Sequence, residues 1–336
     1  QVKDMLKRLN RFFGIVQFAV ERLIHHPGLT FLALLGVVLD VGLVSNASLF
    51  SQAVDQVILN RELEAFSEMT GRPPFSTSVY TFPAGNTAIT LPMAEDLGKE
   101  VANVLSTEVG LPLEHLGTQV HSGNLMLEPT AGSAEYGEEF LGSVGVAYIA
   151  DVADQMQIIS GREMDPEGAS GEVLEVWMHT RLAETMGINV DEEFQLSENA
   201  SADPQRVRIV GLWQAADPDD DFWFENPDAT LRSVFLVRRQ DYIDRIQPMV
   251  PKKTWYLSWH VILDGSRVYP EEAQSYLEGF SRAEVVIAKF LPEARINTPP
   301  LDPLESFVTR GDTLAILLLG FNLPALGFLI YFLVLS

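Results

Sequence analysis

Cysteine is absent from the 336-residue chain, which excludes disulfides, thiolate metal sites and a cysteine nucleophile. Basic residues are scarce as well: 23 Lys and Arg stand against 46 Asp and Glu, and the formal net charge is −23. Nucleic-acid binding needs clustered basic side chains to neutralise phosphates, so we expect no nucleic-acid partner. The chain is nevertheless 47% hydrophobic. This combination indicates that the apolar residues are concentrated in blocks.

Motifs of catalytic chemistry are missing too. The chain has no GxSxG, Walker A or GxGxxG motif. The histidines outside the N-terminal region have no HExxH or paired spacing: His115, His121, His179 and His260. We therefore expect no catalytic residue, no cofactor and no metal site, and no enzymatic activity in this chain.

The most charged run is Asp217-Pro218-Asp219-Asp220-Asp221. Alternating carboxylates can bind Ca²⁺, but an EF-hand loop needs Gly at its sixth position and Glu at its twelfth. Phe222 stands at the sixth position here. A solvated acidic loop is the favoured interpretation, and the sequence leaves open whether Asp217–Asp221 binds an ion.

A first apolar block runs from Leu29 to Phe50 and reads LTFLALLGVVLDVGLVSNASLF. As a helix, 22 residues reach about 33 Å, close to the thickness of the hydrocarbon core. Thirteen are Leu, Val or Phe, and their gain of about 4–8 kcal/mol exceeds the cost of about 3 kcal/mol for the acid Asp40. We predict a transmembrane helix over 28–50. Its length favours a membrane span over a cleaved signal peptide.

A second apolar block runs from Leu314 to Leu335 and contains no charged residue. Fifteen of its residues are Leu, Ile, Val or Phe, so we predict a second transmembrane helix over 314–336. Pro324 predicts a kink near Asn322. Because the sequence stops directly after this block, without a basic flank, we expect it to be a fragment of a longer protein.

The polar residues in these two spans are candidates for contacts within the membrane. Asp40 could be a proton or ion ligand, or an acid that faces a bundle interior and pairs with another helix. Asn46 and Asn322 are more simply hydrogen-bonding residues between helices. These residues, with Pro324, are the predicted intramembrane polar contacts.

The first 27 residues are basic and amphipathic. Apolar residues recur at steps of three and four, while the basic residues mostly occupy other faces. Short flanks rich in Lys and Arg stay on the cytoplasmic side. The N-terminus is therefore predicted to be cytoplasmic and the acidic body extracytoplasmic. The leader could lie in the lipid headgroups or dock a cytoplasmic partner, and its candidate residues are Lys7, Arg8, Arg11 and Arg22.

Helical signals continue outward from both spans. The apolar stripe through Phe50, Val54, Val57 and Ile58 meets no Gly or Pro before Gly71, which predicts a stalk helix. Asp302-Pro303 is typical of a helix N-cap followed by Pro at the first helical position. The predicted segments are a cytoplasmic amphipathic helix (1–27), transmembrane helix 1 (28–50), a stalk (51–69), an α+β extracytoplasmic domain (70–300), a second stalk (301–313) and transmembrane helix 2 (314–336).

The body mixes helix and strand signals, which predicts an α+β domain, with two subdomains favoured. Helices are predicted over Met93–Val109, Ala150–Ile159, Thr180–Met186 and Glu271–Phe290. Strands are predicted over Ser78–Phe82, Ala88–Leu91, Leu125–Leu127, Gly145–Ile149, Val173–Met178, Glu193–Leu196, Val207–Trp213, Ser233–Val237 and Thr254–Leu263. Gly161-Arg162 is expected to be a turn with no chemistry of its own.

This order of parts resembles the FtsX-like or MacB-like permeases of ABC transporters. The first span begins HPGLTFLALLGVV, which is similar to that family's first helix. The segment Ile158–Leu196 is similar to the ectodomain stretch in which a Gly-Arg turn precedes a strand, a short helix and a second strand, and Val207–Gln214 is similar to the strand that follows. The region from Trp255 through the second span is similar to the end of the ectodomain and second span of the long bacterial members.

The resemblance implies a bacterial plasma (inner) membrane protein without a nucleotide site of its own. Its partners would be an ATP-binding cassette ATPase subunit, membrane lipid and a second permease in a homodimer or pseudo-dimer. Its stalks would pass ATP-driven movement to the ectodomain, a mechanism called mechanotransmission. The later spans and the basic cytoplasmic segment of the family are absent from this sequence, so the coupling surface that usually lies there cannot be assigned.

Two other functions are compatible with the same layout. A two-span receptor would sense a ligand with its ectodomain, and an accessory structural subunit would belong to a larger membrane assembly. A permease continues after Ser336 with further apolar spans, whereas a receptor continues with soluble heptads. The natural sequence beyond that residue distinguishes them.

Overall fold

The computed structural model describes residues 53–83, 89–130, 140–199, 201–250, 256–297 and 299–310. The chain forms two compact units, Gln1–Ile58 and Leu59–Ser336. Both predicted spans and the predicted leader lie outside the described residues. Within the described ranges no helix is long and apolar enough to cross a membrane.

Residues 53–70 are helical and overlap the range predicted as the first stalk, 51–69. The helix ends at Gly71, whose φ of 68° is left-handed and whose N–H donates to the Ser67 carbonyl at 2.7 Å. Glycine adopts this conformation without a Cβ clash, so it is suited to close the last helical turn. Residues 301–310 are also helical. This helix begins at Leu301, so Asp302 lies in its first turn and is not the N-cap that the sequence predicted. The function of either helix as a stalk stays a prediction.

One ten-stranded sheet runs through the second unit. Its strands are β1 (Ser76–Thr81), β2 (Leu113–Pro129), β3 (Gly142–Ile149), β4 (Met156–Gly161), β5 (Leu174–His179), β6 (Glu193–Ser197), β7 (Gln205–Ala215), β8 (Val234–Leu236), β9 (Tyr256–Leu263) and β10 (Arg295–Asn297). The longer helices are α3 (Leu91–Val109), α4 (Thr180–Met186) and α8 (Ala273–Phe290), and the shorter ones are α5 (Pro227–Thr230), α6 (Arg239–Asp241) and α7 (Gln247–Met249). The molecule is therefore of the α+β class.

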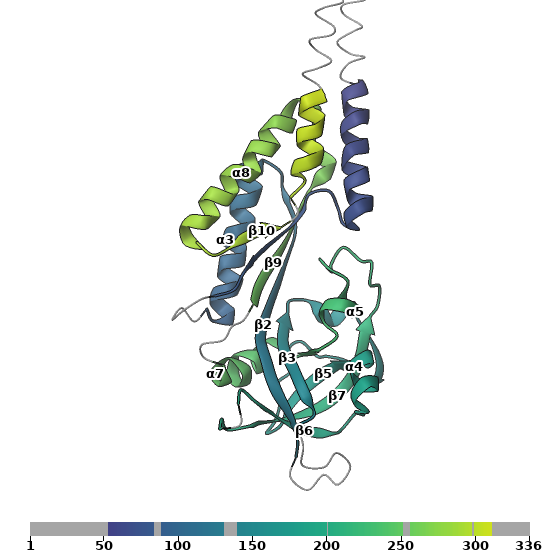
Figure 1. The fold of residues 1–336 in the computed structure, drawn as a ribbon, viewed down its shortest axis with the longest axis vertical. Helices are drawn as coiled ribbons and strands as arrows, with labels where there is room; N and C mark the ends of the chain where they lie inside the picture. Colours follow the sequence, from purple (N-terminus) through teal and green to yellow (C-terminus); the bar gives the residue numbers. More distant parts are fainter. Residues whose placement is uncertain are drawn as a thin grey trace, which may run out of the picture. The chain divides into compact units, whose positions relative to one another are not determined.

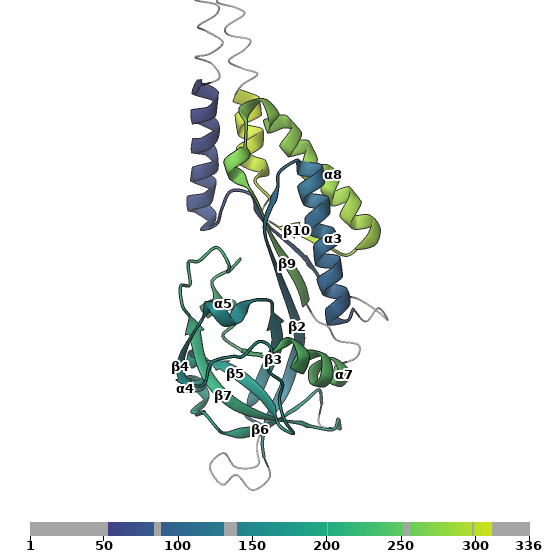
Figure 2. The ribbon, with the colours of Figure 1, turned by 180° about the vertical axis from the view of Figure 1, so that it is seen from behind.

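The first part of the sheet is antiparallel, in the order β10-β1-β9-β2. Helices α3 and α8 pack side by side and cover one face of it (Figures 1 and 2). Buried Trp259 on β9 fixes α3, because its indole N–H donates to the Ala94 carbonyl at 2.8 Å.

The second part of the sheet closes into a ring. Strand pairing runs β2-β3-β8-β5-β7-β6 and returns from β6 to β2. Directly paired residues on all six strands are buried together: Leu125 with Val144, Val146 with Phe235, Phe235 with Met178, Val176 with Ile209, Val207 with Phe194, and Leu196 with Leu127. Since side chains alternate between the faces of a strand, these residues share one face and form the core of a small barrel.

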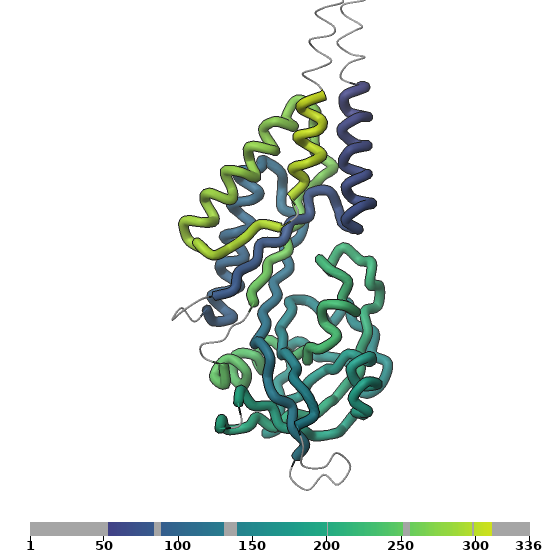
Figure 3. Tube along the Cα trace, in the orientation of Figure 1, coloured from purple at the N-terminus to yellow at the C-terminus, as the bar shows by residue number. Residues whose placement is uncertain are grey.

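Strand β2 belongs to both parts (Figure 3). Its first half pairs with β9, and its last residues pair with β6. The two subdomains favoured by the sequence are therefore not separate: from Leu59 onward the contacts form one unit, and a single strand connects the helix-covered sheet to the barrel.

Two local predictions are wrong, and a third is too short. Ala150–Ile159 is not a helix but a short 3₁₀ turn, Val152–Gln155, followed by β4. Pairing with β7 gives this segment its extended form, and such tertiary contacts override weak local preference. Leu91 is not in a strand but begins α3, with Thr90 as its N-cap. The strand predicted at Leu125–Leu127 is confirmed, but it is part of the 17-residue β2.

Candidate functional site

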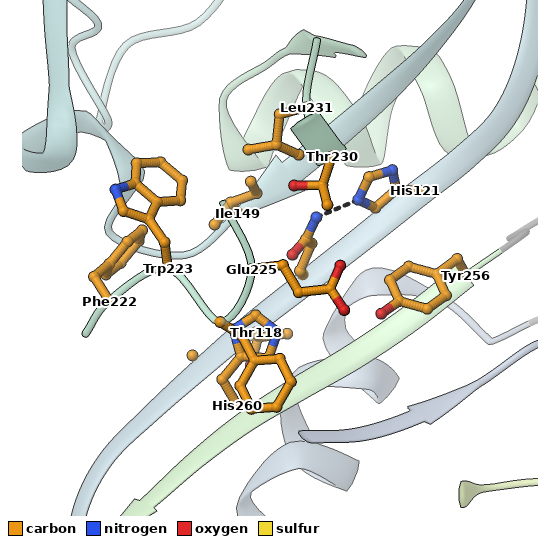
Figure 4. Close-up of a pocket in the computed structure, with 13 residues that line it drawn as sticks. Thr118, His121, Ile149, Phe222, Trp223, Glu225, Thr230, Leu231, Tyr256 and His260 are labelled. Carbon is orange, nitrogen blue, oxygen red and sulfur yellow. Dashed lines mark hydrogen bonds between the residues drawn. The ribbon is translucent and has the colours of Figure 1, made fainter. Parts of the chain in front are cut away.

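A cavity of about 340 Å³ lies between the β2–β9 pair and the loop that follows β7. Figure 4 shows the side chains around it. Ile149 and Leu231 contribute an apolar edge, and Thr230 contributes a hydroxyl. Its volume falls within the range of small-molecule pockets, which makes it a candidate functional site.

The floor of the cavity is one face of β2 and β9. Alternate residues of β2 share this face, since side chains of a strand alternate, and three of them line the cavity: Gly117, Gln119 and His121. The register places Gly117 opposite His260 and His121 opposite Tyr256. Two histidines 139 positions apart in the sequence are therefore brought to one site.

The opposite wall comes from the aromatic run that follows the acidic loop. Phe222 and Trp223 meet edge to face at 4.8 Å. Trp223 in turn stacks on Trp213 of β7, with ring centres 6.2 Å apart and an interplanar angle of 20°. Trp213 and Trp177 belong to a buried cluster on the outer face of the barrel. This packing fixes the aromatic wall to the barrel.

Phe224 joins this wall to the floor and to helix 53–70. One contact of its ring is the Arg72 guanidinium, 3.7 Å from the ring centre, a cation–π arrangement. The ring also stacks with His260 at 4.8 Å and 30°. Arg72 follows Gly71 at the end of helix 53–70. The end of the helix is therefore in contact, through Phe224, with the cavity.

The two histidines of the cavity are neutral at ordinary pH. Burial lowers the pKa of His121 to about 4. Burial, with smaller contributions from the charges of Arg72 and His115, lowers the pKa of His260 to about 3. The Gln119 amide nitrogen contacts His121 Nε2, and because an amide nitrogen can only donate, the imidazole nitrogen accepts. This contact agrees with a neutral His121.

Tyr256, Glu225 and Thr118 also line the cavity with polar side chains. Burial raises the pKa of the Tyr256 phenol, so this side chain carries a proton at neutral pH. His121 meets the Tyr256 ring edge to face, at 5.5 Å between centres. Glu225 is exposed and extends toward Tyr256 (Figure 4). The cavity thus offers aromatic surface, neutral hydrogen-bonding groups and one carboxylate.

The two helices near the ends of the described chain are joined within the second unit. Arg310 Nη1 contacts Glu62 Oε1. Leu59 and Leu63 are buried on one helix, and Leu304 and Phe307 on the other. Helices 59–70 and 301–310 lie side by side in both views (Figures 1 and 2). The chain therefore reaches and leaves the α+β fold along adjacent helices.

None of the site residues predicted from the sequence can be placed in this structure. The leader residues Lys7, Arg8, Arg11 and Arg22 and the intramembrane residues Asp40, Asn46, Asn322 and Pro324 all lie outside the described residues. Asp217 to Asp221 form an exposed loop. In the described part of the chain, no group of three or more His, Asp or Glu is placed to hold a metal ion.

The Gly161-Arg162 turn has a structural function. Gly161 has a φ of 88°, and a Cβ there would stand 2.3 Å from the Val210 carbonyl oxygen. The Arg162 carbonyl accepts the indole N–H of buried Trp177 at 2.9 Å. The turn therefore lets β4 approach β7 and closes over the tryptophan.

A buried ion-pair network lies next to this turn. Arg238 is 6% exposed and donates to Asp241 at 2.8 Å and to Glu175 at 2.6 Å. Ser170 N–H donates to Asp241 Oδ1 at 2.8 Å. These bonds hold the loop before β5 against the barrel.

The cavity was missed from the sequence because β2 was predicted to be three residues long. Within residues 115–121, His115, Gln119 and His121 occupy one set of alternate positions, while Leu116 and Val120 occupy the other, which is a strand signal. His179 plays no part in the cavity. It caps α4 by accepting from Arg181 N–H at 3.2 Å, and its Nε2 lies 3.0 Å from Asp228.

Comparison with known proteins gives fold neighbours only. No family model matches the chain, and no curated protein matches it. The periplasmic region of MacB from Actinobacillus actinomycetemcomitans is similar at 10% identity, over 71% of this chain and 94% of that one, with a TM-score of 0.37. A domain of a protein assigned as a permease, from Porphyromonas gingivalis, is similar at 11% identity over 66% and 88%, with a TM-score of 0.33. At these scores the likeness does not extend to details of the fold or to function.

Proposed function

We propose that the chain is a permease subunit of an ABC-type transporter or mechanotransmission complex. Its α+β unit lies outside the plasma membrane of a bacterium, and its two flanking helices connect that unit to membrane spans at 28–50 and 314–336. ATP is hydrolysed by a partner subunit and not by this chain. The proposal rests on the sequence resemblance together with one structural observation.

That observation is the contact between Glu62 and Arg310. It joins the helix that follows the first apolar block to the helix that precedes the second. Two adjacent helices bound to the same fold can pass a tilt of the spans to the α+β unit. Arg72, which follows the first helix, lies against Phe224. This contact connects the helix to the loop that contains Phe222, Trp223 and Phe224.

The experiment uses the absence of cysteine, which makes any introduced cysteine unique. Glu184→Cys places a thiol at an exposed position of α4, and Lys7→Cys places one in the leader. A membrane-impermeant maleimide should label the α4 variant in intact spheroplasts and the leader variant only after permeabilisation. Equal protection of both variants, or release of the chain from membranes without detergent, contradicts the proposed topology.

The partner is tested separately. The detergent-solubilised complex should contain a second polypeptide that is photolabelled by azido-ATP, while this chain should stay unlabelled. Labelling of this chain itself contradicts the assignment of ATP hydrolysis to a partner. A complex without any nucleotide-binding polypeptide contradicts the permease function and favours a receptor or accessory subunit.

A further inference from the structure

The charges around the cavity are unevenly distributed. Among its described lining residues Glu225 is the carboxylate, and none is Lys or Arg. His121 accepts from the Gln119 amide and is neutral, and His260 stacks on Phe224 beside the Arg72 guanidinium, which disfavours a second positive charge. The lining therefore carries one carboxylate, Glu225, which is exposed. The guanidinium of Arg72, outside the lining, interacts with its charge, but the neighbouring Asp219 and Asp220 leave an excess of carboxylates.

The approach to the cavity is negative as well. A shallow depression shares Trp223, Phe224 and Glu225 with it and is also lined by Asp219 and Asp220. Arg72 is the one basic residue among the described lining of that depression. Carboxylates at the mouth of a partly apolar cleft raise the local concentration of cations and disfavour anions.

The remaining surface suits a flat apolar group. Trp223 and Tyr256 stand at separate sides of the cavity, with the Glu225 side chain between them (Figure 4). Aromatic rings next to a carboxylate attract a cation by two additive effects, the ring quadrupole and the ionic charge. A cavity of about 340 Å³ accepts a molecule of one or two rings.

We propose that this cavity binds a small organic cation, a protonated amine carried on an aromatic body. The ammonium group lies at the Glu225 carboxylate, and the body lies against Trp223 and Tyr256. This inference does not rest on the proposed transport function, because it uses only the charges and shape of the cavity.

The test is isothermal titration calorimetry of the full chain in detergent with three probes of similar shape. 2-Phenylethylamine carries the positive charge, 2-phenylethanol is neutral, and 3-phenylpropionate is negative. The amine should bind at least about tenfold more tightly than the alcohol, as expected for one charge-assisted contact, and the carboxylate should not bind.

Variants locate the site. Glu225→Gln keeps the size of the side chain and, since Glu225 is exposed, leaves the fold intact, which circular dichroism checks. It should lower amine affinity about tenfold, whereas Glu284→Gln, at an exposed position of α8, should leave it unchanged. Equal affinity for the amine and the alcohol overturns the proposal, as does an unchanged affinity in Glu225→Gln or failure of the amine to bind up to its solubility limit.

Discussion

The guanidinium of Arg72 lies 3.7 Å from the centre of the Phe224 ring. Arg72 follows directly on the end of helix 53–70, and Phe224 belongs to the loop that walls the cavity. Since Phe224 also stacks on His260 of β9, three segments that are distant in the sequence meet at one aromatic ring. If helix 53–70 moves, either the loop moves with it or the contact between Arg72 and Phe224 breaks.

Replacing Arg72 with Met should destabilise the α+β unit by about 1 kcal/mol, because the side chain keeps its length and loses its attraction to the ring. Urea denaturation followed by tryptophan fluorescence measures the change. Arg61→Met, at an exposed position of helix 53–70, is the matched control and should have little effect. Equal effects of the two substitutions would show that the stacked contact contributes nothing of its own.

Gly161→Ala should cost more than about 1 kcal/mol, because the residue has a positive φ and a Cβ would overlap the Val210 carbonyl. Gly171→Ala is the control, since a Cβ there has no heavy atom within 4 Å. Thermal unfolding of the two variants gives the comparison. If both lower the melting temperature equally, the close approach of β4 and β7 is not as described.

Arg238→Met should be among the most damaging single substitutions in the barrel. It leaves Asp241 and Glu175 without the guanidinium that both contact, and breaking a buried ion pair costs about 3–5 kcal/mol. Arg232→Met, at an exposed position before β8, should change stability by less than about 0.5 kcal/mol. Denaturant midpoints measure both, and a loss at Arg238 no larger than at Arg232 would contradict the network.

Stability should fall as pH falls below about 6.5. His121 and His260 have their pKa lowered to about 4 and about 3 in the folded chain, so the unfolded chain takes up protons first. The stability is fully present above the unfolded pKa of about 6.5 and is lost progressively toward the folded values, by about 2 kcal/mol for each histidine at pH 5.

The measurement is the urea midpoint of unfolding at pH values from 7 to 5, for the natural chain and for His121→Phe and His260→Phe. Each substitution should reduce the slope of stability against pH by removing one titrating group, whatever its effect on stability at pH 7. Carboxylates add a background that all three proteins share. Slopes that do not change would mean that neither imidazole is buried in its neutral form.

Local patterns were sufficient to predict much of the fold. The helix Thr180–Met186 was predicted with its observed bounds, because Gly187 ends it with a positive φ and the apolar spacing is helical. The α+β class follows from the same mixture of signals. Strands with an apolar alternation, such as β7, were predicted within two residues of their ends.

Features set by distant partners could not be predicted. The closure of the barrel depends on β6 pairing with both β2 and β7, and nothing within Glu193–Ser197 specifies two neighbours. The cavity depends on the register that sets Gly117 opposite His260. Polar residues along β2 hid that strand, because they face a cavity and not a core.

In the mechanism we propose, ATP bound by a partner moves the α+β unit through the flanking helices. Spin labels at Glu64→Cys on helix 53–70 and Glu184→Cys on α4, in the complex reconstituted with its nucleotide-binding partner, measure this directly by pulsed electron paramagnetic resonance. A second pair at Glu184→Cys and Asp203→Cys, both on the barrel, is the control. If the proposed mechanism holds, ATP shifts the first distance and leaves the second unchanged. A first distance that stays constant while the complex hydrolyses ATP would contradict it.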